Sequence, residues 1–252
     1  MTYGFAMAAG YDRGRGLRSR DLERWMAAAR PYLPSAGGRI LDLGAGTGRF
    51  SDALTRAGGA SVVACEPSAA MRAVLHTNRP GALVVGGEAE SVPFRAGVFD
   101  AVWASQVVHH VRDLPAFAAG LRHVLRPEGH VLLRGGFGPV RELPLYRYFP
   151  LAWAPGSAAL LPLERIAGVL ADAGFLPVDH VRVEQTFAET ADELVERVRA
   201  RSLSPLAALP DEAFERGLAE LRSDAASGAL TGPIVERLDL AVFRAPHASP
   251  AA

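Results

Sequence analysis

A short apolar run that ends in a glycine-rich loop constrains this chain more than any other feature. Arg39–Leu43 predicts a buried strand, Gly44-Ala-Gly-Thr-Gly48 follows it directly, and the next residues carry apolar side chains at helical spacing. Glycines at a strand-to-helix turn permit positive φ and let a ligand approach the backbone without a Cβ in the way. The Gly-x-Gly-x-Gly spacing is one residue shorter than the dinucleotide fingerprint. The chain is therefore predicted to hold a nucleotide-like ligand other than a dinucleotide.

Strand and helix patterns alternate after this loop. Apolar runs predict strands at 60–65, 82–85, 99–104, 129–133, 176–184 and 236–244. Helical spacing and caps predict helices at 17–32, 49–57, 68–75, 114–125, 162–174, 190–201 and 211–222. Such alternation predicts an α/β fold, in which a mainly parallel sheet is covered by helices on both faces.

Composition excludes several classes of protein. The 252 residues carry 27 basic and 27 acidic side chains, which argues against a sequence-independent grip on nucleic acid. The single cysteine, Cys65, excludes a disulfide framework and a zinc site built on several thiolates, and we expect no metal. No apolar run reaches the length of about 18 residues that spans a bilayer. We therefore expect a soluble cytoplasmic protein, a monomer or homodimer, without a membrane or nucleic-acid partner.

Acidic residues stand at the ends of three successive predicted strands. Asp42 precedes the glycine loop, where it would repel a pyrophosphate and favour an ammonium group. Glu66 ends the second strand, where a carboxylate can accept both hydroxyls of a ribose, and Glu88 and Glu90 follow the third. Each acid alone also fits a solvated loop end. Because open α/β sheets bind ligands at the carboxyl ends of their strands, the acids together predict a site for a nucleoside that carries a cationic amino acid.

Four segments carry a family resemblance: ILDLGAGTGRF, ACEPSAAM, GGEAESVPFRAGVFDAVWASQVVHHV and HVLRPEGHVLLRG. The chain resembles the class I, Rossmann-like methyltransferases that depend on S-adenosylmethionine, and in particular the methyltransferase type-11 domain. The resemblance implies a three-layer sandwich with a seven-stranded, mostly parallel sheet, an antiparallel last strand and helical cap insertions. It implies one domain over 1–245, with an N-terminal helical arm at 1–36, a cofactor-binding core at 37–137, substrate cap segments at 138–163 and 188–230, and a disordered tail at 246–252.

The resemblance also assigns the cofactor, S-adenosylmethionine, to particular residues. Glu66 would hold the ribose hydroxyls, and Ser105 and Gln106 would contact the methionine end. Two departures from the family pattern are mild, since the family often has Cys at position 45 and Asp at positions 66 and 88. The full implied set is Tyr11, Arg15, Asp42, Gly44, Ala45, Gly46, Glu66, Pro67, Met71, Glu88, Ala89, Glu90, Ser105 and Gln106.

The expected reaction is in-line methyl transfer to a small organic molecule, in which the cofactor brings the reactivity and the protein supplies orientation. His109 and His110 are candidates for a general base, with His110 preferred, although a packed turn also explains the pair. Tyr146 and Tyr148 could orient an acceptor or form a plain apolar cover. Two other functions stay open: a methyltransferase fold that binds the cofactor without methylating, and a nicotinamide dehydrogenase, which the loop spacing disfavours.

Overall fold

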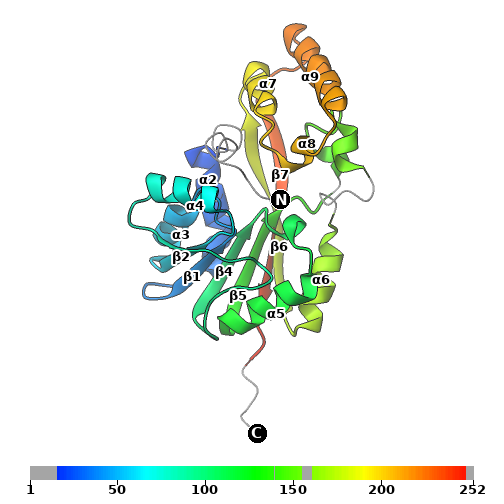
Figure 1. Ribbon diagram of the computed structural model, residues 1–252. Coiled ribbons are helices and arrows are strands. Elements are labelled where there is room, and N and C mark those ends of the chain that lie inside the picture. The colour runs from blue at the N-terminus through cyan, green and yellow to red at the C-terminus, as the bar shows by residue number, and fades with distance from the viewer. Residues whose placement is uncertain (1–15, 139, 155–160, 248–252) are drawn as a thin grey trace.

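The computed structural model describes residues 16–138, 140–154 and 161–247. Seven strands form one sheet in the order β3-β2-β1-β4-β5-β7-β6 (Figure 1). β7 pairs antiparallel with both of its neighbours, and the pairs among the other neighbouring strands are parallel. The expected seven-stranded sheet with an antiparallel last strand is confirmed. The strands are β1 (Arg39–Leu43), β2 (Ser61–Cys65), β3 (Leu83–Val85), β4 (Phe99–Ser105), β5 (Leu125–Gly135), β6 (Leu176–Ala188) and β7 (Ile234–Arg244).

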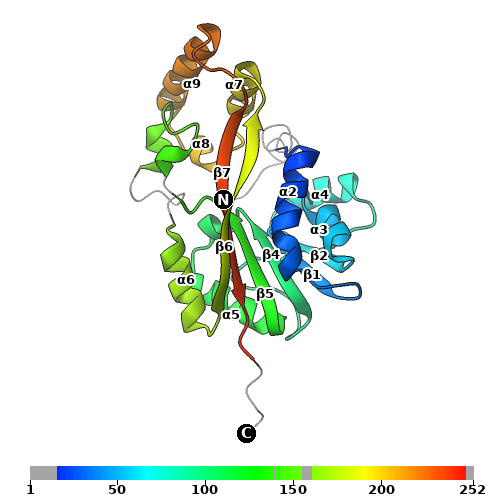
Figure 2. The ribbon, with the colours of Figure 1, turned by 180° about the vertical axis from the view of Figure 1, so that it is seen from behind.

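Helices cover both faces of the sheet. α5 and α6 lie on one face of the sheet, and α2 and α3 lie on the other, as the two opposite views show (Figures 1 and 2). One apolar cluster joins α5 and α6 to their face, and a second joins α2 and α3 to theirs. Ile40 and Leu41 lie in different clusters because successive side chains of a strand point to opposite faces. The α-helices are α2 (Ser19–Ala29), α3 (Ser51–Gly58), α4 (Ala69–Asn78), α5 (Leu114–Val124), α6 (Leu163–Asp172), α7 (Ala191–Arg199), α8 (Ser204–Ala207) and α9 (Asp211–Ala226), and the short 3-10 turns are η1 (Arg30–Tyr32), η2 (Val108–His110), η3 (Val140–Glu142) and η4 (Pro150–Trp153).

Local signals explain several element boundaries. The Ser68 hydroxyl accepts a hydrogen bond from the Met71 N–H, so the predicted Ser cap of α4 is confirmed. The expected helix at 17–32 is instead α2 followed by η1, because Pro31 has no N–H to continue an α-helix. β6 runs four residues past its expected end at position 184, since its pairing with β7 continues as far as Ala188↔Ile234.

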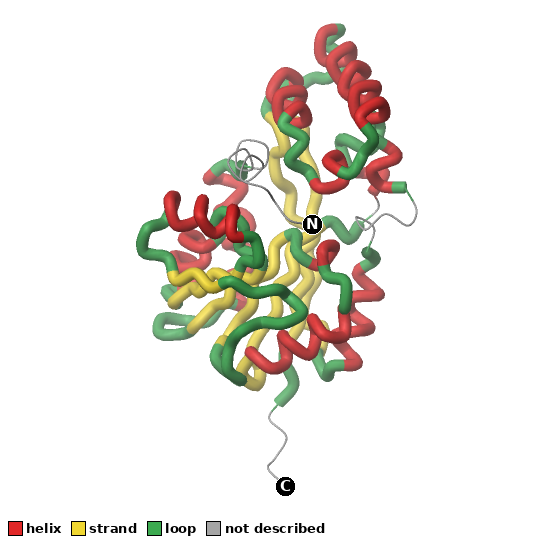
Figure 3. Tube along the Cα trace, viewed as in Figure 1, coloured by secondary structure: helices red, strands yellow, loops and turns green. Residues whose placement is uncertain are grey.

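A third apolar cluster lies beyond the carboxyl end of the sheet, where β6 and β7 extend toward α7, α8 and α9 (Figures 1 and 3). We call it the cap cluster. It brings together parts of the chain on either side of α6, because side chains before that helix pack against α7 and α9. Its buried members are Leu145, Tyr148, Phe149, Ala152, Trp153, Phe187, Ala188, Leu194, Val198, Leu206, Leu209, Phe214, Leu218 and Leu221.

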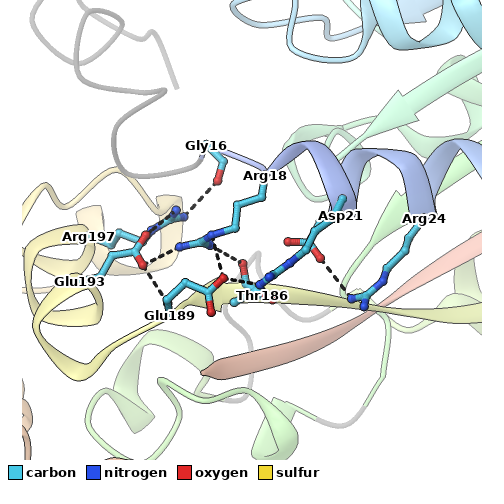
Figure 4. Close-up of polar contacts among 9 residues, drawn as sticks. Gly16, Arg18, Asp21, Arg24, Thr186, Glu189, Glu193 and Arg197 are labelled. Carbon is cyan, nitrogen blue, oxygen red and sulfur yellow. Dashed lines mark hydrogen bonds and ion pairs between the residues drawn. The ribbon is translucent and has the colours of Figure 1, made fainter. Parts of the chain in front are cut away.

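An ionic network fastens the start of α2 to the cap helix α7 (Figure 4). Arg18 contacts Glu193 at 2.6 Å and Glu189 at 3.1 Å. Glu193 also pairs with Arg197, whose Nη1 donates to the Gly16 carbonyl at 3.1 Å. Partial burial acts to raise the pKa of Glu193, but hydrogen bonds from the Glu189 N–H, Arg197 and Arg18 outweigh it, so the net shift of this pKa is downward. The network therefore holds α7 at a fixed place relative to the sheet.

Candidate functional site

Two neighbouring cavities lie at the carboxyl ends of the parallel strands. The glycine-loop cavity, of about 230 Å³, lies over β1, β2 and β4. The cap cavity, of about 150 Å³, lies between the sheet and the cap cluster. Gln106 and Val107, which follow β4, line both cavities. Eleven residues proposed from the sequence line the glycine-loop cavity: Gly44, Gly46, Glu66, Pro67, Met71, Glu88, Ala89, Glu90, Ser105, Gln106 and His110.

The glycine loop has the backbone that its sequence predicts. Gly44, Gly46 and Gly48 have φ values of +66°, +57° and +81°, in the region that favours glycine. The Gly44 N–H donates to the Cys65 carbonyl at 2.8 Å, so the loop closes over the end of β2. A Cβ on Gly44 would lie 2.4 Å from Val107 Cγ2. Glycine is therefore required there by both backbone and space.

Glu66 is held firmly at the wall of the glycine-loop cavity. Its Oε2 accepts from the Gly46 N–H at 2.9 Å, and its Oε1 accepts from the Ser68 N–H at 2.9 Å. Burial raises the pKa of Glu66, while these two hydrogen bonds and Arg72 act in the opposite direction. Each carboxylate oxygen has two lone pairs, so both oxygens can accept a further hydrogen bond from a ligand hydroxyl.

Asp42 and Ala45 are absent from the cavity lining. The Asp42 side chain is 2% exposed beneath the loop, and its Oδ2 accepts from the Ser51 hydroxyl at 2.8 Å. Burial raises the pKa of Asp42 to about 6, with Glu66 adding to the rise and Ser51, Arg79 and Arg49 opposing it. Any effect of Asp42 on a ligand is therefore electrostatic and acts through the loop. Tyr11 and Arg15 lie outside the described residues.

The remaining acids and polar groups of the cavity come from loops after β3 and β4. Glu90 Oε1 accepts from the Arg112 N–H at 2.8 Å, which ties the loop after β3 to the segment before α5. Gln106 has a φ of +59°, an uncommon value for a residue with a Cβ, and its N–H donates to the Arg134 carbonyl at 2.7 Å. This strained turn sets Gln106 between the two cavities.

The two candidate histidines face different cavities. His109 lines the cap cavity and His110 lines the glycine-loop cavity, although their ring centroids are only 4.0 Å apart. The 3-10 turn η2 produces this divergence, because adjacent residues of such a turn point about 120° apart. His109 thus faces the cap cavity, and His110, which the sequence favoured as the base, faces the glycine-loop cavity.

Tyr146 and Tyr148 line neither cavity. Tyr148 is buried in the cap cluster, and its hydroxyl donates to Asp224 at 2.8 Å. Burial, with this hydrogen bond, raises the pKa of Tyr148 to about 12. Tyr146 packs against the same cluster. The plain apolar cover is therefore the better interpretation of both tyrosines.

The sequence did not point to Arg134, a buried polar residue near the end of β5. Arg134 Nη2 donates to Gln185 Oε1 at 2.6 Å, Nη1 donates to the Ser105 hydroxyl at 3.0 Å, and the guanidinium lies 4.4 Å from the Trp25 ring centroid. Arg134 and Gln185 both line the cap cavity. The one signal in the sequence was a cation that ends the apolar run of β5.

Residues 41–133, which contain the glycine loop, Glu66, Glu88 and both histidines, match the family described as methyltransferase domain, of type 11. These residues form a type-11 methyltransferase domain. The domain has the class I fold, and its family uses S-adenosylmethionine, so the cofactor expected from the sequence is confirmed. No described helix has both the length and the apolar character needed to cross a membrane.

Curated relatives resemble the chain over this domain and a little beyond. An uncharacterized methyltransferase of Mycobacterium tuberculosis is 36% identical over 131 residues, which cover 52% of this chain and 50% of the relative. A demethylmenaquinone methyltransferase of Streptomyces avermitilis is 31% identical over 164 residues, which cover 62% of this chain and 65% of the relative. The chain thus spans between half and two thirds of the length of these relatives.

Solved structures extend the likeness of fold across the cap. A putative methyltransferase from an antibiotic biosynthesis pathway of Anabaena variabilis has a TM-score of 0.67 at 24% identity, covering 88% of this chain and 96% of that one. The cyclase SpnF has a TM-score of 0.62 at 18% identity, covering 93% and 84%. At identities of 24% and 18%, these likenesses show a shared fold and nothing about what this chain binds or catalyses.

The raised pKa of Asp42 predicts a pH dependence of cofactor binding. As the pH falls through about 6, Asp42 takes up a proton, and the methyltransferase domain loses a negative charge beneath the glycine loop. A cationic cofactor favours the charged carboxylate, so cofactor binding should lower the pKa of Asp42 and release protons near pH 6. Cofactor affinity should weaken severalfold as the pH drops below that value.

Calorimetry with S-adenosylmethionine at pH 6, in two buffers of different ionisation enthalpy, measures the released protons. The Asp42→Asn variant is the control, since it has no proton to release at this position. Equal proton release by the native chain and the variant would show that Asp42 only supports Ser51 and the loop.

Proposed function

We propose that this chain is an S-adenosylmethionine-dependent methyltransferase that acts on a small organic molecule. The observation that carries the proposal is the pair of neighbouring cavities that share Gln106 and Val107 in their linings. A cofactor in the glycine-loop cavity and an acceptor in the cap cavity would meet beside these shared residues. Methyl transfer requires that arrangement, because the nucleophile must approach the sulfonium methyl in line.

The charge and shape of the glycine-loop cavity support a place for the cofactor there. Glu66 would accept the ribose hydroxyls, and Glu88 with the Ala89 backbone would meet the adenine edge, with Pro67 and Met71 beside the ring. Gly44 and Gly46, with Ser105 and Gln106, would line the methionine moiety, and Asp42 and Ala45 would act from behind the loop. The acidic side chains suit a cofactor with a sulfonium and an ammonium group.

The acceptor's size follows from the cap cavity. Its volume of about 150 Å³ suits a small organic molecule better than a polymer. Phe137, Leu145, Trp153 and Phe187 contribute apolar surface to its wall. A dry, partly aromatic site favours dispersal of the sulfonium charge in the transition state and supports orientation of the acceptor.

The chain's own contribution is position and proton handling. When bound, the cofactor supplies the reactive methyl sulfonium. Holding cofactor and acceptor in line contributes about 7–11 kcal/mol, so a covalent protein intermediate is unnecessary. His109 would take the proton of a hydroxyl or acidic carbon acceptor from the cap-cavity side.

The test is incubation of the purified chain with S-adenosylmethionine labelled in its methyl group and an extract of the source cell. We expect label in at least one small-molecule product, and none with heat-inactivated protein. Reproducible absence of label, with tight binding of S-adenosylhomocysteine, would contradict methyl transfer and leave a cofactor-binding protein.

The second candidate is a chain that binds the cofactor and catalyses a non-methylating reaction or serves as a binding subunit. Its support is that the cyclase SpnF shares this fold over most of both chains. Intact Glu66 and Glu88 fit both functions. The discriminating result is product formation without release of S-adenosylhomocysteine.

A further inference from the structure

Two aromatic side chains in the wall of the cap cavity make no aromatic contact within the described protein. Among the described residues, neither Phe137 nor Trp153 lies in a ring–ring or cation–π contact, although both line the cavity. Phe149 and Phe214 of the cap cluster, by contrast, stack on each other with ring centroids 5.8 Å apart. The two cavity rings are therefore available to an aromatic ligand.

The ring of Phe137 folds back over the end of β5. A Cβ on Gly135 would lie 2.8 Å from Phe137 Cζ and 3.1 Å from Phe137 Cε1, closer than two such atoms can pack. The φ of Gly135 is outside the left-handed region, so a side chain at this position would displace the ring without straining the backbone. Gly135 thus leaves room for the Phe137 ring at the wall of the cap cavity, which both residues line.

The backbone that carries Phe137 is anchored by a buried carboxylate. Asp239 of β7 is 2% exposed, and its Oδ2 accepts from the Phe137 N–H at 2.8 Å and from the Gly138 N–H at 3.1 Å. Its Oδ1 lies 2.9 Å from His180 Nε2, which holds the other side of the carboxylate. Hydrogen bonds to a carboxylate are stronger than those between neutral groups, so the place of Phe137 is set before a ligand arrives.

Trp153 and its neighbours supply the cap side of the cavity. Trp153, in η4, is buried in the cap cluster with Leu145 and Phe187, which also line the cavity. On the sheet side, Phe137 and Leu238 of β7 contribute to the apolar wall. An apolar ligand in the cavity would thus contact side chains of both layers.

The charged residues of the same wall all have contacts within the protein. An acceptor that used one of them would compete with an existing contact, so the surface left for it is mainly apolar and aromatic. The contacts are Arg182–Glu142 at 2.6 Å, Arg197–Glu193 at 3.0 Å, Arg237–Glu184 at 3.4 Å, Arg134–Gln185 at 2.6 Å, Glu236 with Gln185, and Arg49 over the Phe50 ring.

We propose that the methyl acceptor is an aromatic compound whose ring contacts Phe137 and Trp153 in the cap cavity. This inference rests on the proposed function, because it places the acceptor in that cavity. Aromatic pairs in offset or edge-to-face arrangements gain more than their buried area alone provides. A ring held against such side chains has a restricted orientation, which in-line methyl transfer needs. Phe137, anchored on the sheet side, is the residue that selects an aromatic acceptor over an aliphatic one.

The experiment compares phenol with cyclohexanol, which share a hydroxyl and a six-membered ring and differ in aromaticity. Their binding to the native chain saturated with S-adenosylhomocysteine is measured by saturation-transfer NMR. We expect phenol to bind about fivefold more tightly. Phe137→Leu and Gly135→Ala should each reduce this ratio to about two, because the first removes the ring and the second displaces it. The control Phe94→Leu replaces another half-buried ring, which lines neither cavity, and should leave the ratio unchanged.

A native ratio near one, or no binding of phenol, overturns the inference, whether or not the variants fold. An unchanged ratio in Phe137→Leu overturns the role of Phe137. The second measurement is the ultraviolet absorbance and mass of the methyl-labelled product from the cell extract, in which we expect an aromatic ring. A labelled product without such a ring overturns the inference and leaves the proposed function intact. Absence of any labelled product counts against the proposed function instead, so the two failures are distinguishable.

Discussion

Replacing His109 by Ala is expected to lower turnover about 100-fold when the acceptor is a hydroxyl or an acidic carbon. The imidazole lines the cap cavity, where the acceptor's proton would leave. Cofactor affinity should stay within about twofold, since His109 does not line the glycine-loop cavity. The measurement is single-turnover methyl transfer together with calorimetry of S-adenosylhomocysteine.

His110→Ala is the matched control for this prediction. The two rings lie 4.0 Å apart and are tilted by 47°, so both variants disturb the same turn, but only His109 lines the cap cavity. We expect His110→Ala to change cofactor affinity more than the rate of the chemical step. If His109 is a general base, the methyl-transfer rate of the native chain should fall with decreasing pH. The rate of His109→Ala should then not depend on pH. Equal losses of rate in both variants would assign the pair to a packed turn.

Replacing Glu66 by Gln is expected to weaken cofactor binding by about 2–3 kcal/mol, or roughly 30- to 150-fold. The native carboxylate accepts the Gly46 and Ser68 N–H groups and keeps lone pairs for the ribose hydroxyls. A Gln side chain has one acceptor oxygen, so its NH₂ would face one of these donors. The ribose would then lose a charged acceptor and the loop would lose one anchor.

Stability should change little in Glu66→Gln, by less than about 1 kcal/mol, because relief from burying a charge offsets one lost hydrogen bond. Titration calorimetry with S-adenosylhomocysteine and thermal unfolding of the apo protein measure the two effects separately. Glu164→Gln, on the exposed side of α6, is the control and should bind as the native chain does. Unchanged affinity in Glu66→Gln would show that the ribose lies elsewhere.

The strand-to-helix turn was readable from the sequence because its requirements are local. Gly44, Gly46 and Gly48 have positive φ as the spacing predicts, and Glu66 stands at the end of β2 beside them. The carboxyl ends of parallel strands must share one edge, so acids at three strand ends had to converge. The sequence by itself therefore determined the fold class, the place of the glycine-loop cavity and most of its lining.

Only the tertiary structure decided which residues line the cap cavity. His109 and His110 are adjacent, and their assignment to different cavities depends on the hand of one short turn, which spacing does not reveal. Arg134, Gln185 and Trp25 meet across 51 and 160 positions of sequence, through the pairing of β5 and β6 with β7 and the packing of α2. Contacts at such separation follow from how whole elements pack, and no local pattern encodes them.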